Sequence, residues 1–491
     1  MISKLRIMVW LGWLLLLTAA CTTPNRDVEP ITISHLDIFY LNDLHGQIEP
    51  EGARMGLPAI GHFLMTRQAL FPEHTLILAG GDMVHGSALA NLDYGRPVIE
   101  LMQLIGFDAM VVGNHEFDWG LPVITQYFGA GGTDPIADFK LLGANIYEHA
   151  KGGLPETVEP YAIFTRGQLR IGVIGTIGYG LERSIAPQFV EGFAFLDPAP
   201  IVEDLARHLR AAHQVDVILL LTHDSGFVNP DVYQFPEDAR VDVIFNAHSH
   251  QVFAYVEHGV AVIQSGDYGR FVGHVRFDLE GTRIRGMHLE QLTRENEPLL
   301  RYSQPDVERL LETYKQASDT YLNTPIIFNP ETVERDALSR WMARLMRTVT
   351  HADIGLQNSG GTRMPFPGDT YLSMRHLYDV FPFDNTIKTV WLSGHDITQF
   401  LSRTNWRNYD TDIAYFEADK LYKVATNSFV FDQPHNPFLS GIDPEDTLMQ
   451  QRDLVYTELS HQHTLYGYFS VTHTLLSAVL PGEVLPPETQ P

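Results

Sequence analysis

The sequence predicts an α/β protein made of two large domains. Short apolar runs rich in β-branched residues recur along the first half, for example LDIFYL (36–41) and VDVIFN (241–246). Stretches with helical spacing lie between several of these runs, including 56–70 and 198–213. Strands that alternate with helices are typical of a sheet whose strands are buried. The chain has 491 residues, more than one hydrophobic core usually serves, so two domains are expected.

Composition excludes two classes of protein. Hydrophobic residues make up 44% of the chain and charged residues 19%, which is ordinary for a folded body and argues against disorder. The formal net charge is −26, and no basic block occurs. A nucleic-acid polymer is therefore not expected as a partner, because its backbone would be repelled. A small anion can still bind where local cations outweigh the overall field. No protein partner is predicted.

The N-terminus carries a predicted export signal over residues 1–20. Lys4 and Arg6 precede an apolar run that is short for a membrane span, and Cys21, the only cysteine of the chain, follows it. This arrangement resembles a bacterial lipobox, in which the cysteine is lipidated; the alternative is an ordinary signal peptide with an incidental cysteine. We expect an exported bacterial lipoprotein of the outer membrane, facing the periplasm or the cell surface, held only by its lipid. Residues 21–33 read as a tether.

Polar side chains follow five of the predicted strands at the point where each ends. Several of these side chains are histidines, and a histidine found alone in such a place would more often have a structural role. In an α/β sheet, however, sites form beyond the carboxyl ends of strands, so the five groups are expected to meet in one crevice. These strand ends carry Asp43 and His45, Asp82, Asn114 with His115, His223, and His248 with His250.

The predicted ligand set contains carboxylates, imidazoles and an amide, but no thiolate. Such ligands suit zinc, manganese or iron rather than a structural thiolate-bound zinc. There are too many of them for one tetrahedral ion, so the sequence predicts two ions. Two ions about 3.5–4 Å apart can activate a water and hold both oxygens of an in-line displacement at phosphorus.

The order and spacing of these motifs across residues 36–270 resemble those of the calcineurin-like metallophosphoesterases, with Ala247 in place of a usual glycine. The resemblance implies a two-sheet α/β sandwich with a dinuclear metal site. The metals expected are two divalent ions, zinc or manganese, with iron and cobalt as alternatives. In this family the first ion would be held by Asp43, His45, Asp82 and His250, and the second by Asp82, Asn114, His223 and His248.

The same resemblance implies that His115 faces the substrate rather than a metal. Asp118, three residues on, is placed to hold the His115 imidazole by a hydrogen bond. Glu116 is interpreted as a supporting residue. His85 and Asp224 lie beside predicted ligands, and no role is assigned to them.

The pattern changes near residue 300. Residues 304–323 have helical spacing and end before Thr324-Pro325, which predicts a linker helix within 301–325. We therefore expect a metal-binding domain over 34–300 and a smaller α/β substrate-recognition domain over 326–485.

Two segments of the second half resemble the 5′-nucleotidase C-terminal domain: NSGGTR (358–363) and YDVFPFDN (378–385). Glycines let the backbone approach a ligand closely, and an arginine offers paired bonds to phosphate. The resemblance implies that Asn358 and Arg363 bind substrate, and that Phe383 and Phe429 stack on a nucleotide base. After Phe429 the family's Gly-Gly-Asp-Gly turn is missing, and His435 stands where its ribose-binding aspartate is expected.

The sequence thus predicts a two-metal phosphoester hydrolase, a 5′-nucleotidase or an enzyme acting on nucleotide sugars or cyclic nucleotides. One alternative is a manganese-dependent hydrolase of sulfate esters or thiosulfonates from the same superfamily. A second is a non-catalytic binding lipoprotein that has kept the fold.

Overall fold

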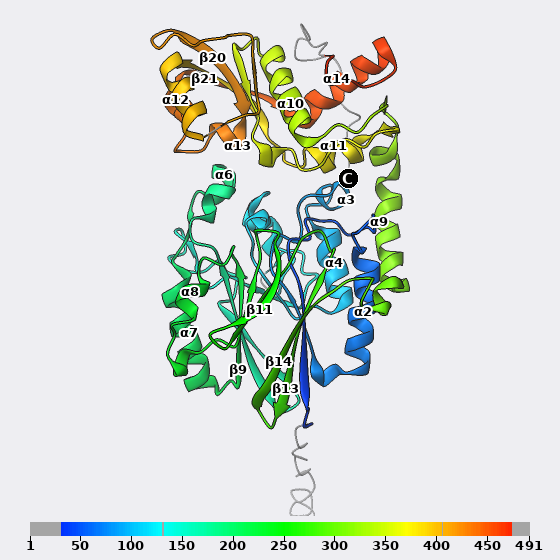
Figure 1. The fold of residues 1–491 in the computed structure, drawn as a ribbon, viewed down its shortest axis with the longest axis vertical. Coiled ribbons are helices and arrows are strands. Elements are labelled where there is room, and N and C mark those ends of the chain that lie inside the picture. The colour runs from blue at the N-terminus through cyan, green and yellow to red at the C-terminus, as the bar shows by residue number, and fades with distance from the viewer. Residues whose placement is uncertain (1–30, 130–131, 405, 474–491) are drawn as a thin grey trace, which may run out of the picture. The chain divides into compact units, whose positions relative to one another are not determined.

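The computed structural model describes residues 31–129, 132–404 and 406–473 (Figure 1). The predicted signal peptide, Cys21 and most of the predicted tether lie outside these residues. From Ile33 onward the described chain forms one compact unit. None of its described helices is both long and apolar enough to cross a membrane.

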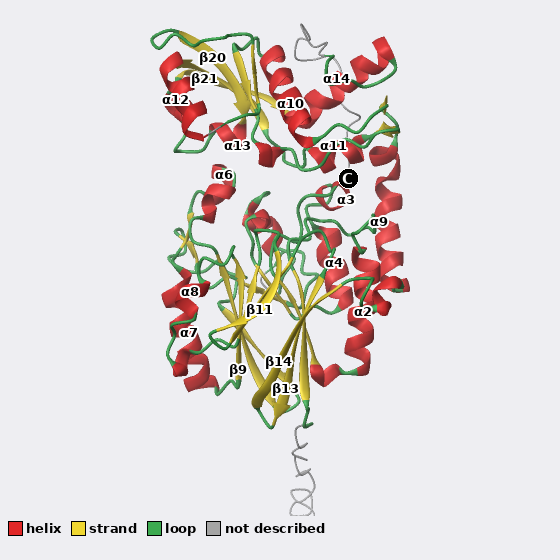
Figure 2. Ribbon diagram, in the orientation of Figure 1, coloured by secondary structure: helices red, strands yellow, loops and turns green. Residues whose placement is uncertain are grey.

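Two six-stranded sheets form the first half of the molecule (Figure 2). Within each sheet, four neighbouring strands run parallel, so their carboxyl ends share one edge. In spatial order the first sheet contains β14 (Arg283–Leu292), β13 (Val272–Glu280), β1 (His35–Leu41), β2 (Thr75–Ala79), β3 (Ala109–Val111) and β4 (Lys140–Leu142). The second contains β11 (Val252–Glu257), β12 (Val260–Ser265), β10 (Val243–Asn246), β9 (Val217–His223), β7 (Leu169–Ile177) and β6 (Tyr161–Arg166).

The sheets pack face to face because alternate residues of each central strand point to opposite sides. In β1, Ile38 and Tyr40 belong to the core between the sheets, together with Phe245 of β10. Their neighbours Phe39 and Leu41 belong instead to the core under the helices of the outer face. A strand that is buried on both faces reads as a continuous apolar run, which is why β1 shows no alternation of polar and apolar residues.

Helices cover the two outer faces, so the layers run helix, sheet, sheet, helix (Figure 1). The predicted helices at 56–70 and 198–213 are confirmed with these bounds as α2 (Gly56–Leu70) and α7 (Pro198–His213). The Asp197 side chain accepts a hydrogen bond from the Ala199 backbone at the start of α7. The remaining helices of this half are α3 (Ala88–Asn91), α4 (Arg96–Ile105), α5 (Leu121–Thr125), α6 (Pro187–Val190) and α8 (Asn229–Val232).

The second half has its own sheet, with helices packed on it. Its strands are, in spatial order, β19 (Tyr409–Thr411), β16 (Ile354–Leu356), β20 (Leu421–Asn427), β18 (Thr386–Ser393) and β21 (Ile442–Gln450). A separate pair joins β15 (Ile327–Asn329) to β17 (Thr370–Leu372). The helices are α10 (Arg335–Val349), α11 (Met374–Val380), α12 (Gly394–Thr404), α13 (Ser428–Phe431) and α14 (Gln451–Tyr466).

One long helix, α9 (Pro305–Asn323), links the halves and packs on the first. Val307 and Leu311 of α9 are buried in the same core as α2 and α4. Gly61 of α2 makes this close packing possible, since a Cβ there would lie 3.1 Å from Val307. The predicted fold class, a two-sheet α/β sandwich followed by a helix and a smaller α/β part, is confirmed.

Packing in the second half depends on Gly355 of β16. A Cβ at this position would lie 1.9 Å from the carbonyl oxygen of Ala343 in α10. That oxygen belongs to a helical backbone and cannot swing aside. We predict that Gly355→Ala lowers the free energy of unfolding by about 1–3 kcal/mol, the usual cost of overpacking. Gly153→Ala is the matched control, because a Cβ there meets no atom within 4 Å. Denaturant unfolding measures both variants, and equal midpoints would contradict the prediction.

Candidate active site

All seven predicted ligands lie together at the shared carboxyl edge of the two sheets. Asp43 and His45 follow β1, Asp82 follows β2 and Asn114 follows β3. From the second sheet, His223 ends β9, while His248 and His250 follow β10. Parallel pairing brings these strand ends side by side, as the sequence predicted. Ligand atoms of Asp43, His45 and His250 all lie within 4.8 Å of one another, and so do those of Asp82, His223 and His248.

In the first group, two imidazole rings face each other beside a carboxylate. The Nε2 atoms of His45 and His250 are 3.0 Å apart, and His250 Nε2 lies 3.4 Å from Asp43 Oδ1. His45 donates its Nδ1 proton to the carbonyl oxygen of His85, and His250 donates its own to Asp267. With the Nδ1 atoms turned toward these acceptors, the Nε2 atoms of both rings face into the group. This is the arrangement found in metal-binding histidines.

The second group is built in the same way around Asp82. His223 donates from Nδ1 to the carbonyl oxygen of Gly80, over 2.7 Å. Its Nε2 lies 3.1 Å from Asp82 Oδ2 and 3.2 Å from Asn114 Oδ1. Asp82 also stands within metal-binding reach of His45, so its carboxylate lies between the two groups.

The electrostatics favour cations at this edge. Burial lowers the pKa of His223, but the Asp82 carboxylate outweighs it and raises that pKa to about 9. Burial likewise lowers the pKa of His250, yet Asp267 and Asp43 raise it to about 9. For His248, burial and the neighbouring His223 lower the pKa to about 4. The carboxylates therefore draw positive charge into the site, and the donor set fits divalent metal ions.

Five of the seven predicted ligands have a left-handed backbone, with φ between 49° and 69°. Only a few per cent of non-glycine residues adopt this region, with aspartate and histidine enriched among them. Each such turn bends the chain directly after a strand and aims a side chain across the sheet edge. These residues are Asp43, His45, Asp82, His248 and His250.

Glu116 fixes the loops that carry Asp82 and Asn114. Its buried carboxylate accepts hydrogen bonds from the backbone N–H groups of Asp82, Met83 and Gly113. Burial and the nearby Asp82 raise the pKa of Glu116 to about 7. Gly113 has no room for a side chain, since a Cβ there would lie 2.4 Å from Asp82 Oδ1. The placement of Glu116 agrees with its interpretation as a supporting residue.

His115 lies beside the metal-ligand groups and pairs with Asp118. Its Nδ1 donates to Asp118 Oδ2 over 2.6 Å, while its Nε2 stands 3.9 Å from Asp82 Oδ2. Burial lowers the pKa of His115, but the Asp118 and Asp82 carboxylates outweigh it and the net pKa is raised. Burial raises the pKa of Asp118, yet His115 and His85 hold it at about 2. The imidazole is thus oriented with Nε2 toward the site.

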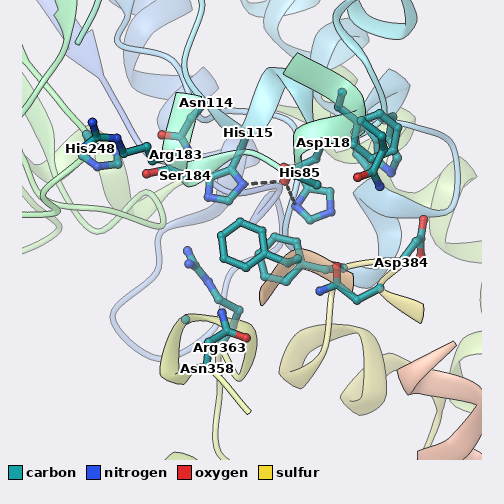
Figure 3. A pocket seen from close by; sticks show the side chains of 18 residues that line it. His85, Asn114, His115, Asp118, Arg183, Ser184, His248, Asn358, Arg363 and Asp384 are labelled. Atoms are coloured by element: carbon teal, nitrogen blue, oxygen red, sulfur yellow. Dashed lines mark hydrogen bonds and ion pairs between the residues drawn. The ribbon is translucent and has the colours of Figure 1, made fainter. Parts of the chain in front are cut away.

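A cavity of about 310 Å³ opens next to His115 and lies between the two halves (Figure 3). The first half contributes Asn114, His115, Asp118 and His248 to its wall. The second half contributes all four predicted substrate-binding residues: Asn358, Arg363, Phe383 and Phe429. Arg363 reaches toward the ligand groups, with Nη2 3.5 Å from His45 Nε2.

The two phenylalanines are held differently. The Phe383 ring stacks on His85 at 5.2 Å and on His115 at 5.8 Å between ring centroids. Buried Arg452 of α14 fixes the Phe383 loop by donating to the carbonyl oxygens of Phe381 and Phe383. Phe429, on α13, is partly buried against the core of the C-terminal sheet and lines the cavity.

The segment after Phe429 does not reach the cavity wall. Asp432 pairs with Lys388 over 2.8 Å, and the carbonyl oxygen of His435 accepts from Arg403. Residues that sequence reasoning left unassigned line the cavity instead, among them His85, Arg183, Asp384 and Asn385. Asp384 and Asn385 fall within the YDVFPFDN motif, so their position was a usable signal. Arg183 carries no such signal.

Comparison with known proteins agrees with this architecture. Residues 36–252 match the family model of the calcineurin-like phosphoesterases, and residues 320–416 match that of the 5′-nucleotidase C-terminal domain. Together the two matches cover most of the described chain.

Two relatives and one solved structure illustrate the similarity. A Bacillus subtilis protein named endonuclease YhcR is 25% identical over 77% of this chain, which spans only 33% of that relative's length. A Vibrio cholerae 5′-nucleotidase is 23% identical, over 79% of this chain and 78% of its own. The crystal structure of a 5′-nucleotidase precursor from Thermus thermophilus aligns with a TM-score of 0.73 at 21% identity, covering 87% of this chain and 96% of that one. The chain belongs to the calcineurin-like metallophosphoesterases with a 5′-nucleotidase C-terminal domain, a family of metal-dependent phosphoester hydrolases.

Proposed function

We propose that the protein hydrolyses nucleoside 5′-monophosphates or related phosphoesters such as nucleotide sugars and cyclic nucleotides. One observation carries the proposal. The cavity beside the metal-ligand groups is lined on one side by His115 and on the other by Arg363, Phe383 and Phe429. A phosphate between His115 and Arg363 leaves an attached base within reach of aromatic rings. The relatives named 5′-nucleotidase support this choice of substrate.

We propose that two divalent ions occupy the ligand groups, with Asp82 shared between them. One would be held by Asp43, His45, Asp82 and His250, and the other by Asp82, Asn114, His223 and His248. Zinc or manganese suits these nitrogen and oxygen donors, with iron and cobalt as alternatives. When bound, such a pair lowers the pKa of a water and neutralises charge at a phosphoryl group.

The residues around the ions then bind and orient the substrate. The positively charged guanidinium of Arg363, which lies at the boundary between the halves, would balance the negative charge of the phosphate. His115 presents Nε2 toward the phosphoryl oxygens while Asp118 holds its Nδ1 proton. Phe383 and Phe429, which both line the cavity, would stack on the base, and the Phe383 ring also packs against His115. Asn358 lines the same cavity as Arg363.

We also propose the five-part organisation that the sequence predicted: a signal peptide over 1–20, a tether over 21–33, the metal domain over 34–300, the linker helix over 301–325 and the substrate domain over 326–485. Export as an outer-membrane lipoprotein facing the periplasm or cell surface belongs to the same proposal. Its support is the basic start, the apolar run and the placement of Cys21.

Catalysis by His115 is expected to be separable from metal binding. We predict that His115→Ala keeps two metal equivalents and lowers kcat by about 10²–10⁴-fold, the usual contribution of a positioned acid or charge stabiliser. Asp82→Ala is the contrasting variant and should lose both equivalents, because its carboxylate serves both groups. Metal analysis of the purified variants, together with steady-state kinetics, measures both effects. Loss of metal from His115→Ala would show that this histidine is a ligand.

Base recognition is expected to depend on Phe429. We predict that Phe429→Ala raises KM about tenfold or more for a nucleoside 5′-monophosphate and leaves 4-nitrophenyl phosphate unaffected, since stacking on a base contributes about 1–3 kcal/mol. Phe383→Ala should also lower kcat, because its ring packs on His115. A panel that includes cyclic nucleotides and sulfur esters completes the test. An unchanged nucleotide KM, or faster hydrolysis of a sulfate ester or thiosulfonate, would overturn the nucleotide assignment.

Membrane attachment is expected to depend on Cys21. We predict that the native protein sediments with membranes and that Cys21→Ser releases it, since stable anchoring needs more than one acyl chain on the modified cysteine. Fractionation followed by immunoblotting measures the distribution. A native protein recovered in the soluble fraction would contradict the lipobox assignment.

A further inference from the structure

Asp118 accepts hydrogen bonds from two histidines through one oxygen atom. His115 Nδ1 lies 2.6 Å from Asp118 Oδ2, and His85 Nδ1 lies 3.0 Å from the same oxygen. The planes of the two imidazoles are nearly parallel, at 7°, and their centroids are 5.8 Å apart (Figure 3). Both histidines are buried. Nothing in the family resemblance assigns a role to His85.

The surrounding hydrogen bonds fix which nitrogen of His85 carries the proton. Asn91 Oδ1 accepts from the backbone N–H of Gly86, which orients the amide. Asn91 Nδ2 then donates one proton to the carbonyl oxygen of Pro382 over 3.0 Å and points the other at His85 Nε2, 3.4 Å away. His85 Nε2 therefore accepts, and its proton resides on Nδ1, facing Asp118.

These contacts join the substrate-binding loop of the second half to the His115 pair. Pro382 directly precedes Phe383, whose ring stacks on both His85 and His115. Asn91 belongs to α3 in the first half, so the Asn91–Pro382 bond crosses between the halves. The path from this loop to His115 is continuous: Pro382, Asn91, His85, Asp118 and His115.

We propose that His85 is a positioning residue for His115. Its Nδ1 proton pins the Asp118 carboxylate, and the pinned carboxylate sets the plane of the His115 ring so that Nε2 faces the phosphoryl group. Through Asn91, the Pro382 carbonyl supports this arrangement when the C-terminal loop lies against α3. The inference rests on the proposed function, in which His115 acts on the phosphoryl group.

The positioning role of His85 requires an N–H donor facing Asp118, and removal of that donor should lower kcat. A carboxylate held by two N–H groups has one orientation, whereas one held by His115 alone can rotate about its side-chain bonds. His115 would then spend less time with Nε2 correctly aimed. Partners that orient a functional group in this way typically contribute about 10–100-fold to activity. The loss should fall on kcat, because the phosphate and base contacts of Arg363 and Phe429 remain.

Two variants distinguish the contribution of the His85 N–H donor from that of its aromatic ring. His85→Phe keeps an aromatic ring against Phe383 and removes the N–H donor. His85→Asn removes the ring and keeps an amide nitrogen at the place of Nδ1. His208→Phe is the matched control, because His208 is exposed on α7, on the outer face of the second sheet. Each protein, loaded with the same metal, is assayed for metal content and for kcat and KM on 4-nitrophenyl phosphate.

We expect His85→Phe to retain metal and lose about 10–100-fold in kcat with little change in KM. His85→Asn should recover most of the loss, and His208→Phe should match the native enzyme. Adding His85→Phe to Asp118→Ala should cause no further loss of kcat, since His85 acts through that carboxylate.

Three outcomes would each overturn the inference: equal kcat in the native enzyme and His85→Phe, failure of His85→Asn to restore kcat, or additive losses in the double variant. A native enzyme that fails to hydrolyse any phosphoester would instead overturn the proposed function.

Discussion

The left-handed turns at the strand ends are the constraint on which the site depends. Each costs on the order of 1 kcal/mol or more relative to an ordinary backbone, and five of the proposed ligands adopt one. Such turns persist only where the surroundings leave the chain no alternative. Here the surroundings are two sheets whose central strands are buried on both faces and enter the turns from fixed directions. The backbone strain is confined to these turns, and the large two-sheet sandwich holds it in place.

Backbone atoms, more than side chains, orient the ligands. His45 and His223 donate to the carbonyl oxygens of His85 and Gly80. Glu116 works in the opposite sense, because its carboxylate accepts from backbone N–H groups of two loops at once. The metal-ligand groups are therefore tied to the path of the main chain. Side-chain partners instead hold His250, through Asp267, and the neighbouring His115, through Asp118.

The residue types and their order along the chain were enough to predict the fold class and to place the seven proposed ligands together at the carboxyl ends of the strands. The position of the site can be predicted locally, because a polar residue directly after a buried strand must lie at the carboxyl edge of the sheet. His85 shows where such reasoning stops. Its partner Asn91 and the carbonyl oxygen of Pro382 meet only through packing between the halves, and no local pattern encodes that. The pairing of Arg452 with Asp384, 68 residues earlier in the chain, could not be predicted for the same reason.

The core beneath α2 has a consequence for how the molecule unfolds. It runs without a break from Phe39 of β1, through Val307 of α9, to Trp341 of α10 and Leu459 of α14. Two halves that share one continuous hydrophobic cluster lose its stabilisation together, so heating should melt them in one cooperative transition. Separate folding units would be expected only if that cluster ended at the linker helix. The ordering of the C-terminal half is thus coupled energetically to the integrity of the N-terminal half.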